Sequence, residues 1–143
     1  MSMRISRHDS RVIALSALFS YQITAQDPDR VFEETTGFYC PQGVLSSYLD
    51  YARNLFLAAV RNRDALDKLI ESRAEGWTIS RMPVVDRCIL ELALAEIKYS
   101  GDAPFEVVLD EAVNLAKEYG TADSPAFING LLVGILKQDA LQG

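Results

Sequence analysis

The stretch of sequence that decides the fold runs from Asp86 to Leu132 and reads DRCILELALAEIKYSGDAPFEVVLDEAVNLAKEYGTADSPAFINGLL. Apolar residues recur along it at helical intervals, and two short breaks, each with a small or polar residue followed by proline, interrupt them. This pattern predicts three amphipathic helices. The first is apolar around most of its circumference, so we expect it to be the central buried helix.

Each of the three segments carries an apolar row at helical spacing, which is the pattern of a helix face that packs on a core. The rows consist of Val85, Cys88, Ile89, Leu92 and Tyr99 in the first segment, Phe105, Val108, Ala112, Leu115 and Tyr119 in the second, and Phe127, Ile128, Leu131, Leu132 and Ile135 in the third.

Two glycines in this stretch have different expected roles. Gly120 follows the second segment and fits the left-handed position that commonly ends a helix. Gly130 follows Asn129, a pair typical of hairpin turns, but the apolar period continues through it without strand-like alternation. We therefore expect Gly130 inside a helix, where it loses about 1 kcal/mol against alanine. A close approach of another helix or an open ligand-binding surface would explain it.

The rest of the chain repeats the helical pattern over residues 12–21, 31–37, 45–59 and 65–70. We predict an all-α protein of about seven helices, arranged as two small antiparallel bundles that pack as one domain. The two subdomains are expected to cover residues 1–75 and 76–143 of the 143-residue chain.

Composition agrees with a small cytosolic protein, because 49% of the residues are apolar, which supplies a core of ordinary size. Cys40 and Cys88 are far apart in sequence, so reduced thiols are expected, without a metal site or other cofactor. The arginines before the apolar run of residues 12–21 imitate a secretory signal, but Asp9 and two serines interrupt it. No stretch has the length of a membrane span, and no membrane association is expected.

The first helix holds the clearest functional clue. Arg4, Arg7, His8 and Arg11 stand at i, i+3, i+4 and i+7, so they share one face and are expected to project into solvent. Residues 1–26 carry a net charge of +2, whereas the remainder carries −8. Guanidinium groups bind phosphate and stack on unpaired bases, so this face favours single-stranded RNA. The alternative is a solvated basic face near a chain end.

The order of residues in several segments resembles the NusB family of transcription antitermination factors. The matching motifs are Asp86-Arg87 with its apolar run, Asp110 to Val113, Leu115 to Lys117, Tyr119-Gly120, Phe127 to Leu132, and, near the N-terminus, Arg11 with Ala17 to Gln22. The resemblance covers residues 1–26 and 77–136; between them only length and helicity agree.

This resemblance implies a protein that binds the boxA element of ribosomal RNA leader transcripts within the transcription elongation complex. Arg7 and Arg11 match arginine positions of the family's RNA-binding helix, while His8 and Asp9 stand where the family often has further arginines. The family's RNA surface also includes the start of the last helix, which matches Asp123, Ser124 and Phe127. Phe127 is either a stacking platform for a base or a core residue.

The resemblance further implies a heterodimer with NusE, a basic ribosomal protein of the small subunit. Asp86, Glu91 and Glu96 lie along the first segment, and Asp86 matches a position that faces NusE in the family. An acidic surface of this kind complements a basic partner. For Glu91 the alternative is a helix-surface ion pair with Arg87, four residues earlier.

The chain lacks the parts of a catalytic site. Its single histidine is His8, and it has neither an HExxH motif nor a glycine-rich phosphate loop. We therefore expect a binding protein and no enzyme. The alternative to an RNA-binding factor is a docking scaffold of the same fold with little RNA binding of its own. The apolar rows leave open whether a second copy covers one of these faces, and a homodimer is one such arrangement.

Overall fold

Helices make up almost all of the chain that the computed structural model describes, which comprises residues 6–39, 47–74, 78–100 and 103–142. No strand occurs within these ranges, so the all-α prediction is confirmed. The described helices are α1 (Arg7–Thr24), α2 (Pro28–Tyr39), α3 (Ser47–Arg61), α4 (Arg63–Arg73), the 3-10 helix η1 (Ile79–Arg81), α5 (Val84–Ala95), the π-helix η2 (Glu96–Ser100), α6 (Phe105–Tyr119) and α7 (Ser124–Gln142).

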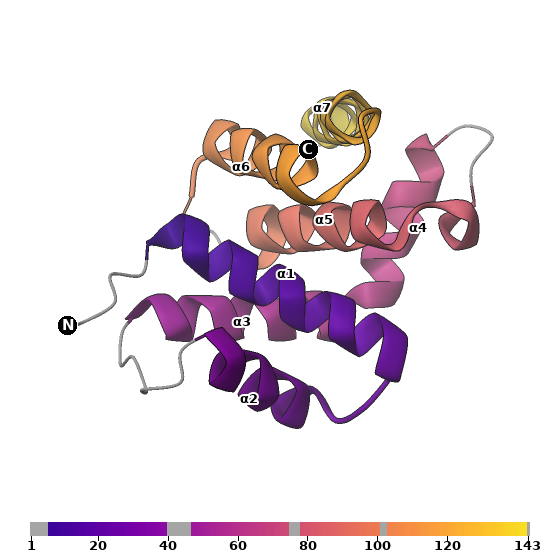
Figure 1. Ribbon diagram of the computed structural model, residues 1–143. Helices are drawn as coiled ribbons and strands as arrows, with labels where there is room; N and C mark the ends of the chain where they lie inside the picture. The colour runs from indigo at the N-terminus through magenta and orange to yellow at the C-terminus, as the bar shows by residue number, and fades with distance from the viewer. Residues whose placement is uncertain (1–5, 40–46, 75–77, 101–102, 143) are drawn as a thin grey trace.

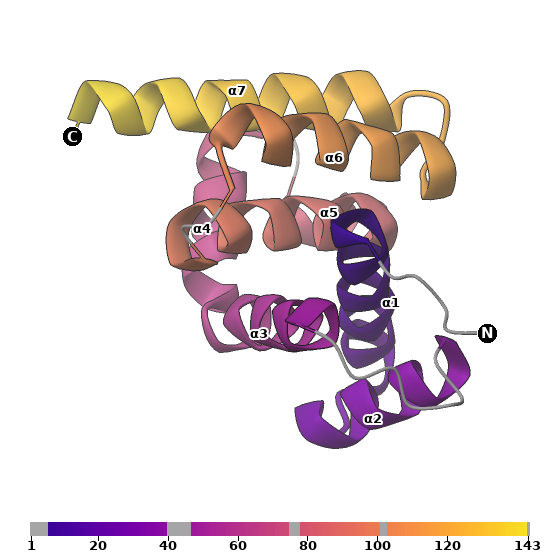
Figure 2. The ribbon, with the colours of Figure 1, turned by 90° about the vertical axis from the view of Figure 1, so that its left-hand side faces the viewer.

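Helix α5 lies at the centre, as its sequence predicts. Nine of its twelve residues are buried, and it packs against α1, α3, α4, α6 and α7. Figure 1 shows α1 crossing in front of α5, and Figure 2 shows the antiparallel pair α6 and α7 on one side of α5 with α1 and α3 on the other. The arrangement explains why this helix is apolar on nearly every face, since it has neighbours on nearly every side.

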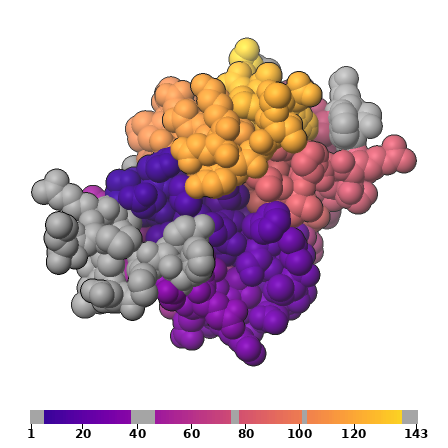
Figure 3. All heavy atoms as spheres, viewed as in Figure 1, coloured from indigo at the N-terminus to yellow at the C-terminus, as the bar shows by residue number. Residues whose placement is uncertain are grey.

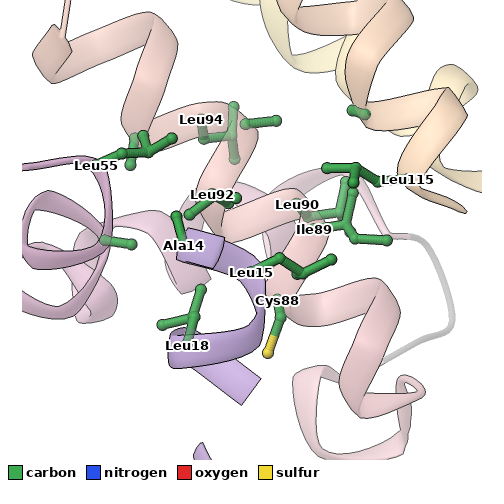
Figure 4. Close-up of a cluster of buried hydrophobic side chains, with 14 of the residues drawn as sticks. Ala14, Leu15, Leu18, Leu55, Cys88, Ile89, Leu90, Leu92, Leu94 and Leu115 are labelled. Atoms are coloured by element: carbon green, nitrogen blue, oxygen red, sulfur yellow. The ribbon is translucent and has the colours of Figure 1, made fainter. Parts of the chain in front are cut away.

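The hydrophobic core forms around α5 (Figure 4). Leu90 and Leu94 of α5 are fully buried, together with Leu18 of α1 and Leu55 of α3. Burying one leucine side chain contributes about 1.5–3 kcal/mol, so these contacts are what joins the N-terminal helices to the C-terminal ones. Cys88 belongs to the same core, and burial raises the pKa of its thiol to about 12, which keeps it protonated.

Three aromatic residues of the predicted apolar rows are exposed instead of buried. Phe105 is 37% exposed, Tyr119 47% and Tyr99 48%, while the middle of each row is buried as expected. Phe105 and Tyr119 are the first and last residues of α6 and extend beyond the layer that covers them. Tyr99 lies in the π-helix, whose wider turn breaks the 3.6-residue period on which the prediction rested.

Gly120 ends α6 but not in the predicted left-handed conformation. Its φ of −92° and ψ of −165° are extended, and any residue can adopt them. A Cβ at this position would meet the Ser124 Oγ at 2.6 Å and the Ala116 carbonyl oxygen at 2.8 Å. Glycine is therefore required by the close approach of the first turn of α7 and not by backbone conformation.

Gly130 lies inside α7, so the helix-interior prediction is confirmed. A Cβ there would have no atom within 4 Å. Within the described ranges no other helix approaches Gly130 closely, so the open surface is the alternative that remains.

Helix α4 shows how the two expected subdomains meet. It precedes residue 75, yet it packs against α5 and α7 as well as α3. The boundary near residue 75 stays a prediction. Among the described residues no helix is both long and apolar enough to cross a membrane. Arg4 and Cys40 lie outside the described residues.

Candidate functional site

Apart from Glu91, which lies midway along α5, the described residues of the predicted sites fall at two opposite ends of this helix. Arg11 lies beside Glu96 at the C-terminal end, with Arg7 and His8 about one turn earlier on α1, whereas Phe127 and Asp86 line one hollow at the N-terminal end. Ten residues of helix separate Asp86 from Glu96, which corresponds to about 15 Å along the axis. The structure therefore does not bring the basic face of α1 and the start of α7 together into one contact site.

The first turn of α1 is fixed by a capping box. The Ser6 Oγ accepts a hydrogen bond from the Asp9 backbone N–H at 3.2 Å, and the Asp9 carboxylate accepts one from the Ser6 N–H at 2.8 Å. These bonds satisfy two of the free N–H groups at the helix start. Asp9, which interrupts the basic sequence, therefore sets where α1 begins, and the helix starts at Arg7.

Arg11 is buried, so the prediction that it projects into solvent is wrong. It is 5% exposed, and its guanidinium donates to both carboxylate oxygens of Glu96, with Nε at 2.8 Å from Oε1 and Nη2 at 2.6 Å from Oε2. Burial works against the charged form of Arg11, but these hydrogen bonds raise the pKa of its guanidinium. Arg11 ties α1 to the end of α5 and presents no donor to a ligand.

Glu96 is likewise enclosed and cannot face a partner protein as predicted. It is 2% exposed, and the Tyr51 hydroxyl from α3 donates to it in addition to Arg11. Burial and the neighbouring carboxylate together raise the pKa of Tyr51, so the phenol stays protonated. Three helices meet at this carboxylate.

Arg7 is the residue of the basic face that remains accessible among those described. It is exposed, and its guanidinium carbon lies 3.7 Å above the centre of the Tyr51 ring and 5.4 Å from that of Tyr48. The ring faces hold the plane of the guanidinium without using its N–H groups. Those donors stay available for a phosphate.

His8 is half-exposed and lies between two carboxylates of α6. Its Nδ1 is 2.9 Å from Glu111 Oε2, and its Nε2 is 3.4 Å from Glu118 Oε1. The hydrogen bond to Glu111 is the main cause that raises the pKa of His8 above 6.5. In Figure 3 the indigo start of α1 lies directly against the orange surface of the C-terminal helices. Protonated His8 therefore has its charge neutralised by α6 and is a poor free phosphate ligand.

Asp86 and Ser124 form a buried pair at the other end of α5. Asp86 is 4% exposed and Ser124 is 1% exposed, and the Ser124 Oγ donates to Asp86 Oδ1 at 2.7 Å. Both side chains are buried and bonded to each other, so the predicted contacts of Asp86 with NusE and of Ser124 with RNA stay predictions. The pair fixes the start of α7 against α5.

A hollow of about 250 Å³ opens above this pair and is lined by Met82, Pro83, Asp86, Thr121, Asp123 and Phe127. Phe127 is half-buried: it packs against the core and also lines the hollow. Phe127 therefore contacts the core, as one alternative expected, and its role as a stacking platform stays a prediction. Asp123 is exposed at the rim, so the hollow offers carboxylate oxygens that accept hydrogen bonds from base amino groups and repel phosphate.

Glu91 is fully enclosed in the middle of α5, so it cannot be a partner contact as predicted. The Gln22 amide donates to it at 2.7 Å, and Arg63 and Arg87 lie 3.6 Å and 3.4 Å from its Oε2. The alternative prediction, the ion pair with Arg87, is confirmed, although it is not on the surface. Burial, with a further contribution from Asp67, raises the pKa of Glu91 to about 8.

An apolar hollow of about 380 Å³ between α1, α5 and α6 was not expected from the sequence. Leu15, Ser16, Phe19, Val85 and Tyr119 line it. Phe19 is 37% exposed, and Val84 beside the hollow is 43% exposed. One signal was available in the sequence, since Leu15 and Phe19 are four residues apart and share a helix face that bears no charge between them.

The fold and site define a small all-helical binding protein that combines an arginine held on tyrosine rings with an exposed apolar hollow. The sequence model of the NusB family matches residues 8–137. The chain belongs to the NusB family. The transcription antitermination protein NusB of Symbiobacterium thermophilum is 39% identical to it, with 93% of this chain and 90% of that protein covered. That of Geotalea uraniireducens is 40% identical, with 89% and 91% covered.

Solved structures of NusB proteins have the same fold as this chain. T. maritima NusB superposes with a TM-score of 0.85 at 33% identity and covers 94% of this chain and 93% of its own. A structure described as antitermination factors NusB and NusE in complex with dsRNA gives a TM-score of 0.84 at 26% identity and covers 92% of this chain and 96% of its own. The relatives are named for transcription antitermination and not for an enzymatic activity, which agrees with the expectation that the chain is not an enzyme.

Proposed function

We propose that this protein is a transcription antitermination factor that binds boxA-type single-stranded RNA together with NusE and acts in the cytoplasm with the transcription elongation complex. The observation that carries the proposal is the family match over residues 8–137, joined to a fold shared with a NusB that was solved in complex with NusE and RNA.

Two places on the surface suit RNA, and each suits a different part of it. Arg7 offers free guanidinium donors to a phosphate from its position above Tyr51. The hollow beside Phe127 offers a ring face and the Asp123 carboxylate, which suit a base. An RNA strand would have to pass the length of α5 to use both.

The burial of Arg11 limits the affinity that α1 can provide. Each phosphate neutralised on a single strand contributes about −0.7 to the slope of log K against log salt. Arg7 alone therefore accounts for a slope of about −0.7, and a matching contribution from Arg4 would double it. Strong RNA binding requires a second basic surface, which a basic partner supplies.

We place the docking site for NusE on the apolar hollow around Phe19, because the acidic residues first predicted for it are buried. Exposed aromatic and aliphatic side chains at this hollow provide the kind of apolar centre on which protein interfaces depend. Residues 27–143 carry a net charge of −8, which attracts a basic partner to the surrounding surface.

A docking scaffold with little RNA binding is the second candidate. The specific observation in its favour is that Arg11 and His8 are both occupied by carboxylates, which leaves Arg7 as the accessible cation of the described basic face. A homodimer that closes over the apolar hollow belongs to this candidate.

Fluorescence anisotropy of a labelled boxA-type RNA, titrated with this protein, with NusE and with both at two salt concentrations, tests the proposal. We expect binding that tightens with NusE, weakens with salt and weakens severalfold in Arg7→Ala. Arg53→Ala is the matched control, because Arg53 is an exposed arginine on α3 that pairs with Asp29. A stable NusE complex without RNA binding would favour the scaffold. Replacement of Phe19 by aspartate should abolish NusE binding in either case.

A further inference from the structure

A polar cavity of the described chain lies between α3 and the π-helix η2, apart from both hollows discussed above. It has a volume of about 440 Å³ and is lined by Tyr51, Asn54, Arg61, Asn62, Tyr99 and Ser100, with Ala58 between them. Figure 2 shows the C-terminal end of α5 next to α3, and the lining residues place the cavity between these two elements. Of these residues, the sequence motifs included Tyr99 alone, and they placed it in an apolar row and not at a binding site.

The cavity has a polar rim whose groups are not used by the fold. Within the described part of the chain, neither Asn54 nor Arg61 forms a hydrogen bond or an ion pair, and both are exposed. The Asn62 amide donates to the Ala58 carbonyl at 2.8 Å, which leaves its own carbonyl oxygen as an acceptor. The Arg61 guanidinium, the Asn54 amide and the Asn62 carbonyl oxygen therefore line one cavity, and the fold does not use them.

The π-helix supplies an aromatic face to the same space. Tyr99 is 48% exposed although a tyrosine on α5 would be expected to pack inward. The extra residue in the π turn places Glu96 inward, against Arg11, and leaves Tyr99 outward at the cavity. The geometry thus keeps a large aromatic side chain at the surface, where it stabilises no core.

The floor of the cavity carries no net charge. Tyr51 donates to Glu96, and Glu96 is paired with Arg11, so the buried carboxylate behind the floor is already neutralised. Ser100 lines the cavity together with Tyr51. Arg61 is therefore the charge that a ligand meets first, and it favours an anion.

We propose that this cavity binds one nucleotide unit, with its base on the Tyr99 ring, its phosphate on Arg61 and a base edge at Asn54. Aromatic rings bind bases of any sequence by stacking, and amide side chains read base edges through paired donors and acceptors. The nucleotide is either free in solution or one residue of an RNA strand. Tyr51 lines the cavity and also carries Arg7 over its ring, so a strand on Arg7 passes next to the cavity.

Nuclear magnetic resonance of the side-chain amides of Asn54 and Asn62 tests the proposal in the full-length protein. One arm uses adenosine 5′-monophosphate and the other a short oligoadenylate. We expect saturable shifts of these amides in at least one arm. Shifts with the mononucleotide identify a free ligand, and shifts with the oligonucleotide alone identify a residue of RNA.

Variants then test whether the Arg61 guanidinium and the Tyr99 ring bind the nucleotide that shifts the amide resonances. Arg61→Gln and Tyr99→Ala are each expected to weaken this binding about tenfold, the size of one stacked base or one charged contact. The matched controls are Arg53→Gln and Tyr119→Ala. Arg53 is another exposed arginine of α3, and Tyr119 is 47% exposed and lines the apolar hollow around Phe19. The controls are expected to change the affinity less than twofold.

Unshifted amides in both arms, or equal affinities in the variants and their controls, would overturn the proposal. Because the test reads Asn54 and Asn62 of the unaltered chain, loss of folding in a variant cannot decide it. The anisotropy experiment with boxA-type RNA is separate. If RNA binds there but the resonances of the Asn54 and Asn62 amides do not shift, nucleotide binding in this cavity is ruled out and the proposed function still stands.

Discussion

The two ends of α5 each bury a carboxylate but hold it by different means. At the C-terminal end, Glu96 is bound by a guanidinium from α1 and a phenol from α3. At the N-terminal end, Asp86 accepts a hydrogen bond from the neutral Ser124 hydroxyl of α7. The first end is fixed by charge and the second by close packing around Gly120.

The difference matters for function because the conspicuous basic sequence lies at the charge-fixed end. A buried ion pair is costly to break, since the remaining partner stays buried and unpaired. Arg11 is thus needed to hold three helices together, and Arg7, one turn earlier, is left to meet a ligand. The two arginines share a helix face but not a role.

Replacement of Arg11 by alanine should give the largest loss of stability. We expect the free energy of unfolding to fall by about 3–5 kcal/mol, because Glu96 would keep a buried charge without its cation. Arg7→Ala, the matched control, should cost about 1 kcal/mol or less, the value of an exposed cation–π contact. Urea denaturation of both variants measures the difference.

Equal losses for the two arginines would contradict the assigned roles. The double variant Arg11→Met with Glu96→Leu should recover most of the lost stability, because it removes both charges from the buried site.

Replacement of Gly120 by alanine should disturb the packed end of α5 by about 1–3 kcal/mol, the usual cost of overpacking. The added methyl group would lie 2.6 Å from the Ser124 Oγ, so the start of α7 must move and the hydrogen bond to Asp86 should lengthen. Denaturation gives the cost, and the resonances of Ser124 report the movement. An unchanged free energy of unfolding would mean that the start of α7 can move away from the added methyl group at no cost, which would contradict the close packing assigned to this end.

Gly130→Ala is the opposite case on the same helix and should stabilise the protein by about 0.5–1 kcal/mol. The new Cβ would point into open space, and alanine favours the helix. The thermal midpoint should therefore rise. A lower midpoint would show that this open surface tolerates no added methyl group.

The smallest effect is expected at His8. Its raised pKa means that its ion pairs with α6 stabilise the fold fully below the unfolded pKa of about 6.5, and that this contribution is lost as pH rises through the higher folded pKa. The side chain is 37% exposed, so the contribution should be about 0.5 kcal/mol or less. The stability difference between the wild type and His8→Ala should shrink between pH 6 and pH 8. A difference that stays constant would contradict this assignment.

The sequence predicted the helices well and the surroundings of single side chains poorly, for a physical reason. Helical spacing depends on neighbours three and four residues away, so the buried α5 and the interior position of Gly130 could be read directly. Whether Arg11 is buried or exposed depends on its ion pair with Glu96, which is 85 residues further along the chain. Spacing placed Arg7 and Arg11 on one face but could not show which of them lies over that carboxylate.

The other corrections have the same origin. Gly120 was expected to adopt a left-handed conformation at the end of α6, but its backbone is extended and it is the contact with Ser124 across a turn that excludes a side chain. Asp86 and Glu91 were read as surface acids because charge is usually exposed. Their partners Ser124, Gln22 and Arg63 come from three different helices, and no local pattern identifies them.

The capping box at Ser6 and Asp9 has a consequence for the rate at which the protein releases a ligand. A helix end without such bonds frays, and a ligand must then arrest the fluctuating turn before it gains a contact. Here the first turn is already ordered, so Arg7 meets a phosphate with little further loss of conformational entropy. A single cation on a preordered turn can thus give a longer residence time than its one charge suggests.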